Sequence, residues 1–300
     1  MFARIALLIQ PFLFSANMLA ARFAAGDFPP IALAFWRWSL ALMILTPFII
    51  TPFCQHYKEI WHHRTGLLVL GGLGMGVCGA FVYIGANSTS AVNIGVIYSA
   101  SPVFILLIAR FFYQKPIAAP AMIGIIMALF GVLWVISKGQ LQALLSIDFV
   151  AGDLWILGAA IGWAFYSIWS GQWQIALPAT LKLGAVIAGG VIILFPFMLA
   201  EGVSIGWPQF NLNTMLLVLF LSLVASLGAY KLYLYLIHAL GAAIAGLTLY
   251  LTPITAGLMG FLLLGEPMEL YHFVSLAMVL GGIALSNIKP RKPALLATKL

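Results

Sequence analysis

The feature that most constrains the fold is a series of apolar segments, each long enough to cross a membrane, that follow one another along the chain. A helix needs roughly 20 apolar residues to cross the hydrocarbon core of a bilayer. The connections between the segments are short, so no water-soluble domain is expected. Applied along the chain, the requirement for roughly 20 apolar residues predicts ten spans. They lie at residues 3–24, 31–53, 66–87, 91–113, 117–137, 152–172, 178–200, 214–238, 242–264 and 268–288.

The composition supports a protein whose main solvent is lipid. Of 300 residues, 64% are hydrophobic and 7% are charged, whereas soluble proteins are about half apolar and a quarter charged. The net charge of +7 does not indicate a nucleic-acid partner, because the basic residues are not gathered on one amphipathic face. Cys54 and Cys78 form neither a disulfide framework nor a metal-binding spacing. We expect no metal and no cofactor.

Lysine and arginine residues in short loops predict the orientation, because they favour the cytoplasmic side. With the N-terminus in the cytoplasm, Arg22 and Lys138 lie outside, and Glu59 is the one acidic residue inside. The basic residues then on the cytoplasmic side are Arg4, Lys58, Arg64, Arg110, Lys115, Lys289, Arg291, Lys292 and Lys299. Both termini are therefore expected in the cytoplasm, in a multi-pass protein of a bacterial inner membrane.

Residues 3–24 could also be interpreted as a signal peptide, since Arg4 precedes an apolar run and small residues follow near Ala20 and Ala21. The length of the apolar run favours a membrane span. The internal repeat described next requires this helix as well.

The two halves of the sequence are related by an internal repeat. A shift of 149 residues places Pro29 on Pro178, and Pro47-Phe48 falls on Pro196-Phe197. A shift of 151 residues gives further matches, namely Ala91 with Ala242, Gly95 with Gly246, Pro102 with Pro253, Pro116 with Pro267 and Gly131 with Gly282. We predict a first five-helix repeat at 1–138, a periplasmic linker at 139–151, a second repeat at 152–289 and a basic cytoplasmic tail at 290–300.

Five spans is an odd number, so the second repeat enters the membrane inverted relative to the first. Inverted repeats are typical of transporters, in which two halves alternately open a site between them to either side of the membrane. The expected architecture is two inverted five-helix repeats around a central cavity. The expected mechanism is alternating access.

Three sequence segments carry a resemblance to a known family: LTPI at 251–254, LLGEP at 263–267 and GGIAL at 281–285. Together with the five-plus-five spans, they resemble the drug/metabolite transporter superfamily, EamA type. The many aromatic residues are similar to those of its YddG-like aromatic amino acid exporters. The resemblance implies export of metabolites from the cytoplasm. Gln114 and Lys115 replace the Gly-Glu of the second repeat, so the motif is intact only once.

Two prolines are candidates for hinges beside the cavity. Pro102 and Pro253 lie near the middle of the spans at 91–113 and 242–264, where each removes one helical hydrogen bond. Irregular backbone at membrane depth survives only inside protein or beside water. A simple packing kink is the alternative interpretation.

Aromatic and polar residues near mid-membrane are the candidates for substrate binding. Trp163 is the one tryptophan expected near the midplane, and Tyr166 follows one helical turn later. They could stack a planar substrate, or Trp163 could simply be buried in the helix bundle. The weaker candidates are Asn17, Tyr83, Tyr98, Ser99, Tyr230 and Tyr250.

Lys231 is the cation singled out for a substrate carboxylate. It lies roughly two helical turns from the end of its span, and a charge inside the membrane indicates function by default. The alternative is a lysine that extends to the membrane surface. Arg37 lies at a similar depth in the second span and ranks below Lys231 as a candidate.

The sequence places no aspartate or glutamate in the middle of a predicted span. This favours zwitterionic, anionic or neutral substrates over cationic drugs, because a lipophilic cation needs an acidic partner. It also favours downhill export, with coupling through His238 or Lys231 as the alternative. We predict a monomeric exporter of aromatic or hydrophobic amino acids and related metabolites.

Other functions rank lower. Another small cargo is the first alternative, whether a nucleobase, a nucleoside, a cofactor precursor or a drug. An intramembrane enzyme is disfavoured, because the sequence lacks H-E-x-x-H and G-x-S-x-G motifs and has no pair of carboxylates in the spans. A receptor or scaffold would not explain the repeat.

Overall fold

The computed structural model describes residues 2–114, 119–140, 150–173, 175–240 and 242–286. Within these ranges the chain is helical, and no strand occurs. The elements are α1 (Phe2–Phe23), α2 (Pro30–His62), α3 (Arg64–Gly71), η1 (Gly72–Val77), α4 (Cys78–Ala86), α5 (Ala91–Ser99), α6 (Ser101–Tyr113), α7 (Ala119–Ile136), α8 (Ala151–Gln172), α9 (Ala179–Ser204), α10 (Leu212–Phe220), η3 (Leu221–Gly228), α11 (Ala229–Leu240), α12 (Ala242–Leu264) and α13 (Leu270–Ser286).

The predicted all-α membrane class is confirmed. Seven helical stretches are long and apolar enough to cross a membrane. Shorter apolar helices at Met122–Val135, Leu251–Leu264 and Leu270–Leu285 lie in the other predicted spans. The chain is therefore a multi-pass membrane protein, and the number of ten spans stays a prediction.

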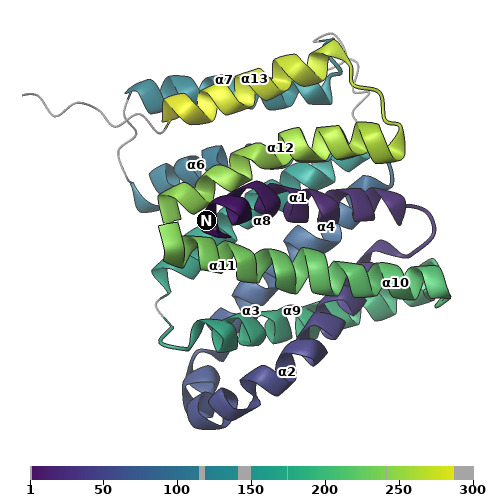
Figure 1. Ribbon diagram of the computed structural model, residues 1–300, viewed down its shortest axis with the longest axis vertical. Coiled ribbons are helices and arrows are strands. Elements are labelled where there is room, and N and C mark those ends of the chain that lie inside the picture. Colours follow the sequence, from purple (N-terminus) through teal and green to yellow (C-terminus); the bar gives the residue numbers. More distant parts are fainter. Residues whose placement is uncertain (1, 115–118, 141–149, 174, 241, 287–300) are drawn as a thin grey trace, which may run out of the picture.

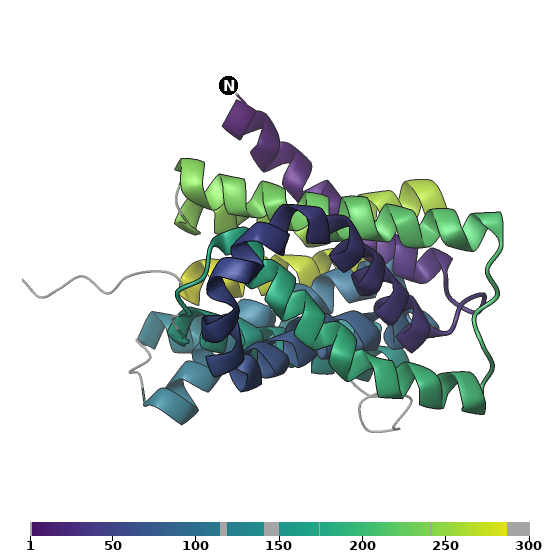
Figure 2. The ribbon, with the colours of Figure 1, turned by 90° about the horizontal axis from the view of Figure 1, so that it is seen from below.

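The helices lie side by side in a layered bundle (Figures 1 and 2). α7 and α13 pair along one edge, and α2 packs against α9 near the other. α1 packs between these edges against α12 and α11. The backbones of α3 and α9 touch, because a Cβ atom on Gly71 would lie 2.3 Å from the amide nitrogen of Gly190. Such contacts between small residues are how helices associate closely in lipid.

Two helical stretches contain π-helical turns at related positions. η1 lies between α3 and α4, and η3 lies between α10 and α11. The 151-residue shift that aligns Pro102 with Pro253 carries residues 72–77 onto 223–228, which fall inside η3. π-Helical turns are rare and frequently occur at functional sites. The two halves thus share an irregularity of the backbone that the sequence alone did not reveal.

The expectation of two symmetric proline breaks is corrected. The stretch at 91–113 is divided into α5 and α6, with Pro102 at the start of α6, whereas α12 continues through Pro253. The hydroxyl of Ser15 donates a hydrogen bond to the carbonyl of Thr252 at 3.0 Å, and Thr255 donates to the same carbonyl at 3.0 Å. The carbonyl that Pro253 leaves without its helical donor is that of Leu249, four residues earlier, so these hydroxyl groups do not replace the missing bond. They join α1 to α12 beside the proline.

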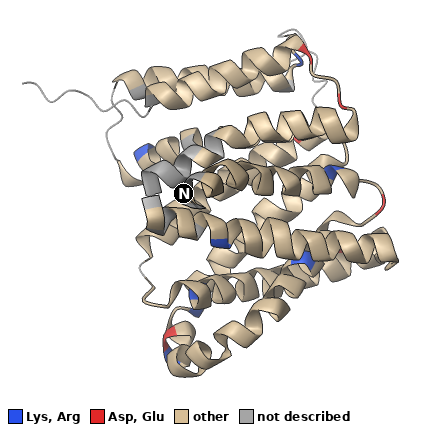
Figure 3. Ribbon diagram, viewed as in Figure 1, with Lys and Arg blue, Asp and Glu red and all other residues tan. Residues whose placement is uncertain are grey.

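The charged residues lie mostly near the ends of the bundle (Figure 3). Glu201 accepts hydrogen bonds from the amides of Ile31 and Ala32, at 2.9 and 2.7 Å, where α2 begins. Glu59 lies near the opposite end of α2 and contacts His63 at 2.9 Å. This distribution agrees with the sorting of charge read from the sequence, while the assignment of each end to a side of the membrane remains a prediction.

Candidate functional site

A buried arginine is the centre of the candidate site. Arg37 on α2 has 3% of its surface exposed. Its Nε donates to the hydroxyl of Ser226 at 2.6 Å, and its Nη2 donates to the carbonyl of Ala225 at 3.1 Å. Its Nη1 donates to the side-chain oxygen of Asn17 at 2.5 Å and to the hydroxyl of Tyr83 at 2.7 Å. The guanidinium therefore joins α1, α2, α4 and η3.

The π-helical segment η3 presents the polar groups that face Arg37. The hydroxyl of Ser226 donates to the carbonyl of Leu221, five residues earlier, at 2.9 Å. It can therefore accept the bond from Arg37 at the same time. One turn earlier, the hydroxyl of Ser222 donates to the backbone carbonyl of Arg37 at 2.8 Å. η3 thus holds both the side chain and the backbone of this arginine.

The charge of Arg37 is not neutralised by the residues around it. All four hydrogen-bond acceptors are neutral, and no carboxylate of the described residues forms an ion pair with it. A buried charge is costly unless it is paired. The guanidinium offers planar, bidentate recognition of a carboxylate or phosphate. The surroundings of Arg37 are therefore suited to an anionic group of a solute.

Aromatic side chains form a cluster beside the arginine. The ring centroids of Tyr98 and Trp163 are 6.3 Å apart, and those of Trp163 and Tyr166 are 5.2 Å apart. All three side chains are half-buried. The ring of Trp38 is 4.6 Å from the Arg37 guanidinium and 5.8 Å from the ring of Tyr230, which interacts electrostatically with Tyr98 and Tyr166. These aromatic faces are suited to contact with an apolar or planar solute.

The structure brings most of the predicted site residues together. Asn17 and Tyr83 contact each other at 3.0 Å as well as Arg37, and Tyr98 and Tyr230 lie near enough to interact with Arg37 electrostatically. Ser99 is buried, and its hydroxyl donates to the carbonyl of Val96. The side chains of Pro102 and Tyr250 lie outside the described residues.

Lys231 is placed differently from the other predicted residues. Its side chain is exposed, and its ammonium lies 5.3 Å from the ring centroid of Phe48, which is itself exposed. Its neighbour Tyr230 points instead toward Trp38. Of the two cations expected at membrane depth, the structure places Arg37, the lower-ranked one, among the aromatic and polar candidates.

Sequence reasoning missed two of the partners of Arg37. The π-helical turn positions the hydroxyl of Ser226 and the carbonyl of Ala225. No sequence motif predicts this turn. The signal for Arg37 itself was present, since a charge inside an apolar segment indicates function.

The helical bundle and the buried polar site define the chain as a multi-pass membrane protein of the solute-transporter class. The model of the EamA-like transporter family matches residues 1–137 and 150–288, and the chain belongs to this family. Membership indicates transport across a membrane, and it points away from an enzyme.

Curated relatives cover most of the chain. The "Uncharacterized transporter YyaM" of Bacillus subtilis (strain 168) is 24% identical over 276 residues, which is 91% of this chain and 89% of the relative. The "Uncharacterized inner membrane transporter YedA" of Escherichia coli (strain K12) is 25% identical over 292 residues, which is 94% of this chain and 90% of the relative. Their names support membrane transport, and they specify no cargo.

A solved crystal structure shares the fold. Its TM-score is 0.63 at 15% sequence identity, and the match covers 95% of this chain and 96% of the other. At this identity the likeness shows the fold alone.

Proposed function

We propose that the protein exports aromatic or hydrophobic amino acids and related small metabolites across a bacterial inner membrane by alternating access. The observation that carries this proposal is Arg37, a buried cation whose hydrogen-bond partners are neutral and which lies against the ring of Trp38. A carboxylate and an apolar ring on one small solute would match these two features.

The substrate carboxylate would meet the Nη1 side of the guanidinium. There the neutral acceptors are the oxygens of Asn17 and Tyr83. A carboxylate adds a full negative charge and two oxygens that match the guanidinium in a bidentate pair, so it would displace these neutral acceptors. The side chain of the substrate would contact the rings of Trp163 and Tyr166. In this role Arg37 takes the place that the sequence suggested for Lys231.

The site draws on both predicted repeats, which supports alternating access. Asn17, Arg37 and Tyr83 belong to the first repeat, whereas Trp163 and Ser226 belong to the second. Movement of one repeat against the other would open the site to one side and then to the other. We propose a monomer as the transporting unit, since one chain supplies both halves.

Uptake of radiolabelled phenylalanine and tryptophan into proteoliposomes of the purified protein tests the proposal, with and without an imposed pH gradient. Saturable uptake without a gradient supports facilitated export, and uptake that needs the gradient supports coupled export. No uptake by a folded preparation would reject the aromatic amino acid cargo. Competition by phenylalanine amide, which lacks the carboxylate, should be weak if Arg37 binds that group.

A second candidate cargo is a planar heterocycle, such as a nucleobase, a nucleoside, a cofactor precursor or a drug. The half-buried rings of Tyr98, Trp163 and Tyr166 favour it, since they offer stacking surfaces that do not require a carboxylate. A competition panel of these compounds against labelled tryptophan distinguishes the two candidates.

A further inference from the structure

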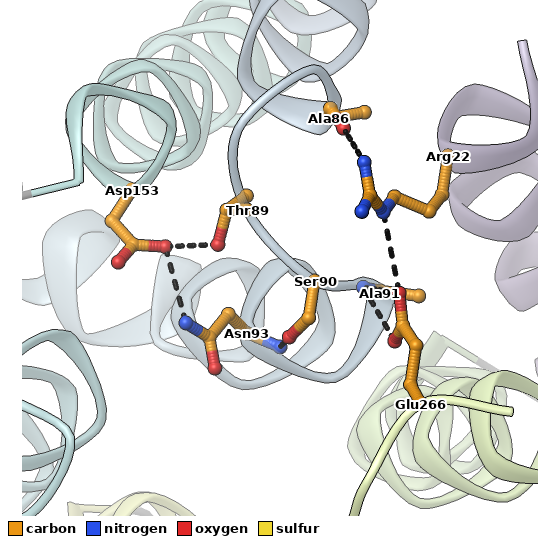
Figure 4. Close-up of polar contacts among 8 residues, drawn as sticks. All are labelled: Arg22, Ala86, Thr89, Ser90, Ala91, Asn93, Asp153 and Glu266. Carbon is orange, nitrogen blue, oxygen red and sulfur yellow. Dashed lines mark hydrogen bonds and ion pairs between the residues drawn. The ribbon is translucent and has the colours of Figure 1, made fainter. Parts of the chain in front are cut away.

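A cluster of polar contacts surrounds the turn between α4 and α5, at one end of the bundle (Figure 4). Arg22 on α1 donates from Nη1 to the carbonyl of Ala86 at 3.0 Å, and its Nε lies 3.4 Å from a carboxylate oxygen of Glu266. Both oxygens of Glu266 also accept from the amide of Ala91, at 3.1 and 2.9 Å. The turn is therefore joined to α1 and to the segment that follows α12.

Asp153 holds the same turn from its other side (Figure 4). It lies at the start of α8 and is fully buried. Its Oδ1 accepts hydrogen bonds from the hydroxyl of Thr89 and, at 3.3 Å, from the side-chain amide of Asn93. Its Oδ2 is buried and has no hydrogen-bond partner among the residues that the structure describes. Both interactions thus fall on one carboxyl oxygen.

The carboxylates at this end of the bundle differ in how they are compensated. Glu266 has the guanidinium of Arg22 and an amide, and Glu201 accepts from two amides at the start of α2. Asp153 has two neutral side-chain donors, and among the residues that the structure describes no cation lies within ion-pair distance of it. A buried carboxylate without a counter-charge is costly, whereas a protonated carboxyl is neutral.

We propose that Asp153 is a proton-binding site that controls closure at this end of the transporter. One proton from water adds to Oδ2 of the carboxylate and gives a neutral carboxylic acid, while Oδ1 remains the acceptor for Thr89 and Asn93. In this form α8 and the turn at 86–91 pack together as observed. Loss of the proton leaves a carboxylate that requires water, so the turn separates from α8 and the end opens. This effect of Asp153 protonation on closure does not depend on which cargo the protein carries.

Within the described part of the chain, Asp153 is the member of this cluster that has no charged partner. Lys138 and Tyr271 interact with it electrostatically without an ion pair or a hydrogen bond. His272 on α13 reaches it only through Asn93, since its Nε2 lies 3.2 Å from the side-chain oxygen of Asn93. Glu269 lies beside His272 and donates its backbone amide to the Nδ1 of that ring.

The other helices packed on α8 direct their titratable groups elsewhere. On α4, Tyr83 binds Arg37, and the thiol of Cys78 donates to the carbonyl of Ala159 further along α8. On α6, the hydroxyl of Tyr113 accepts from the indole of Trp169, toward the other end of α8. The remaining charged or titratable groups on α3 and α6 are Arg64, which binds the carbonyl of Trp61, and Arg110, which lies at the end of α6 remote from the turn.

Infrared difference spectroscopy of the full-length protein in lipid nanodiscs tests proton binding directly, with no need for a substrate. Labelling with ¹³C-carboxyl aspartate separates aspartic-acid bands from those of glutamic acid. The parent should show a protonated-carboxyl band that disappears as the pH rises. Asp153→Asn should lack this band, and Asp153→Glu should show a titrating band at the unlabelled glutamic-acid position. The matched control is Asp27→Asn, an exposed loop residue, which should keep the parental band.

Hydrogen–deuterium exchange of the turn at 86–91 tests the link to closure. After correction for the intrinsic rate, exchange in the parent should rise at least about tenfold across the pH range where the infrared band disappears. In Asp153→Asn it should not depend on pH. The proposal is overturned if no band titrates, if the band persists in Asp153→Asn, or if sodium ions instead of protons change the exchange. Failure of the amino acid uptake assay with an intact band would reject only the proposed cargo.

Discussion

The two π-helical segments occupy equivalent positions under the 151-residue shift, yet their side chains contact different parts of the site. In η1, the sequence GLGMGV leaves space: a Cβ atom on Gly74 would lie 2.8 Å from the ring of Tyr166. In η3, the sequence LSLVASLG supplies the hydroxyls of Ser222 and Ser226, which hold Arg37. One segment thus accommodates an aromatic ring, and the other binds the cation. A repeated backbone irregularity serves two different chemical purposes.

The largest effect should come from the group that η3 holds. Arg37→Met should lower kcat/KM for phenylalanine by at least about 100-fold, since truncating a buried charged partner costs roughly 2–5 kcal/mol and roughly 1.4 kcal/mol corresponds to tenfold. Arg37→Lys keeps the charge without the bidentate geometry and should recover part of the activity. The measurement is initial uptake into proteoliposomes. An equal loss for phenylalanine and for an analogue without a carboxylate would contradict the assigned role.

The next largest effect concerns the space in η1. Gly74→Ala should displace the ring of Tyr166 and raise KM for tryptophan about tenfold, because overfilling a packed site costs roughly 1–3 kcal/mol. Gly76→Ala is the matched control, since a Cβ atom there would have no neighbour within 4 Å. Uptake kinetics and the thermal midpoint of both variants give the comparison. The role of η1 as a space for the ring is refuted if the two variants behave alike.

An effect of similar size separates the two serines of η3. Ser226→Ala removes a hydrogen bond to the guanidinium, and bonds to charged groups contribute roughly 1.5–3 kcal/mol. We expect KM for phenylalanine to rise roughly tenfold. Ser222→Ala removes a bond to the backbone carbonyl of Arg37 and should mainly lower the thermal midpoint. Equal kinetic effects of the two substitutions would show that η3 acts only on the backbone of α2.

The smallest effect is expected at Lys231. Its exposed ammonium contacts the ring of Phe48, and an exposed cation–π contact contributes roughly 0.5–1 kcal/mol. Lys231→Met should therefore change phenylalanine uptake by less than about fivefold. A loss as large as that of Arg37→Met would indicate that Lys231 binds the substrate carboxylate. It would contradict the conclusion that η3 holds the substrate-binding cation while η1 accommodates the aromatic ring.

The sequence predicted more of the fold than of the site. Membrane helices are recognised by length and apolar content, and these are local properties of the chain. The side chains of Asn17, Tyr83, Tyr98, Trp163 and Tyr166 were expected near a common site, and the structure brings them near Arg37 or each other. α12 continues through Pro253 and contacts α1 there, through a hydrogen bond between residues 237 apart in sequence. The role of Pro253 as a hinge beside a cavity stays a prediction.

The buried carboxyl of Asp153 shows a similar limit. In the sequence it lies at the start of the predicted span at 152–172, a position where a charge commonly faces the membrane surface. Its burial arises from the contacts of α8 with Thr89 and Asn93, which lie on other elements. A residue at a helix end can be exposed or enclosed, and the packing of neighbouring helices decides which.

By itself, the sequence determined the helical membrane class, the approximate spans and the resemblance to the transporter family. Only the tertiary structure decided which cation lies inside. Successive residues of a helix are turned by about 100°, so Tyr230 and Lys231 cannot face the same way. α11 carries tyrosines, Lys231 and His238 among its apolar residues, and a polar or aromatic side chain can face either the protein interior or the membrane surface. The contacts with α1 and α2, and not the pattern of residues, turn Tyr230 inward and leave Lys231 exposed.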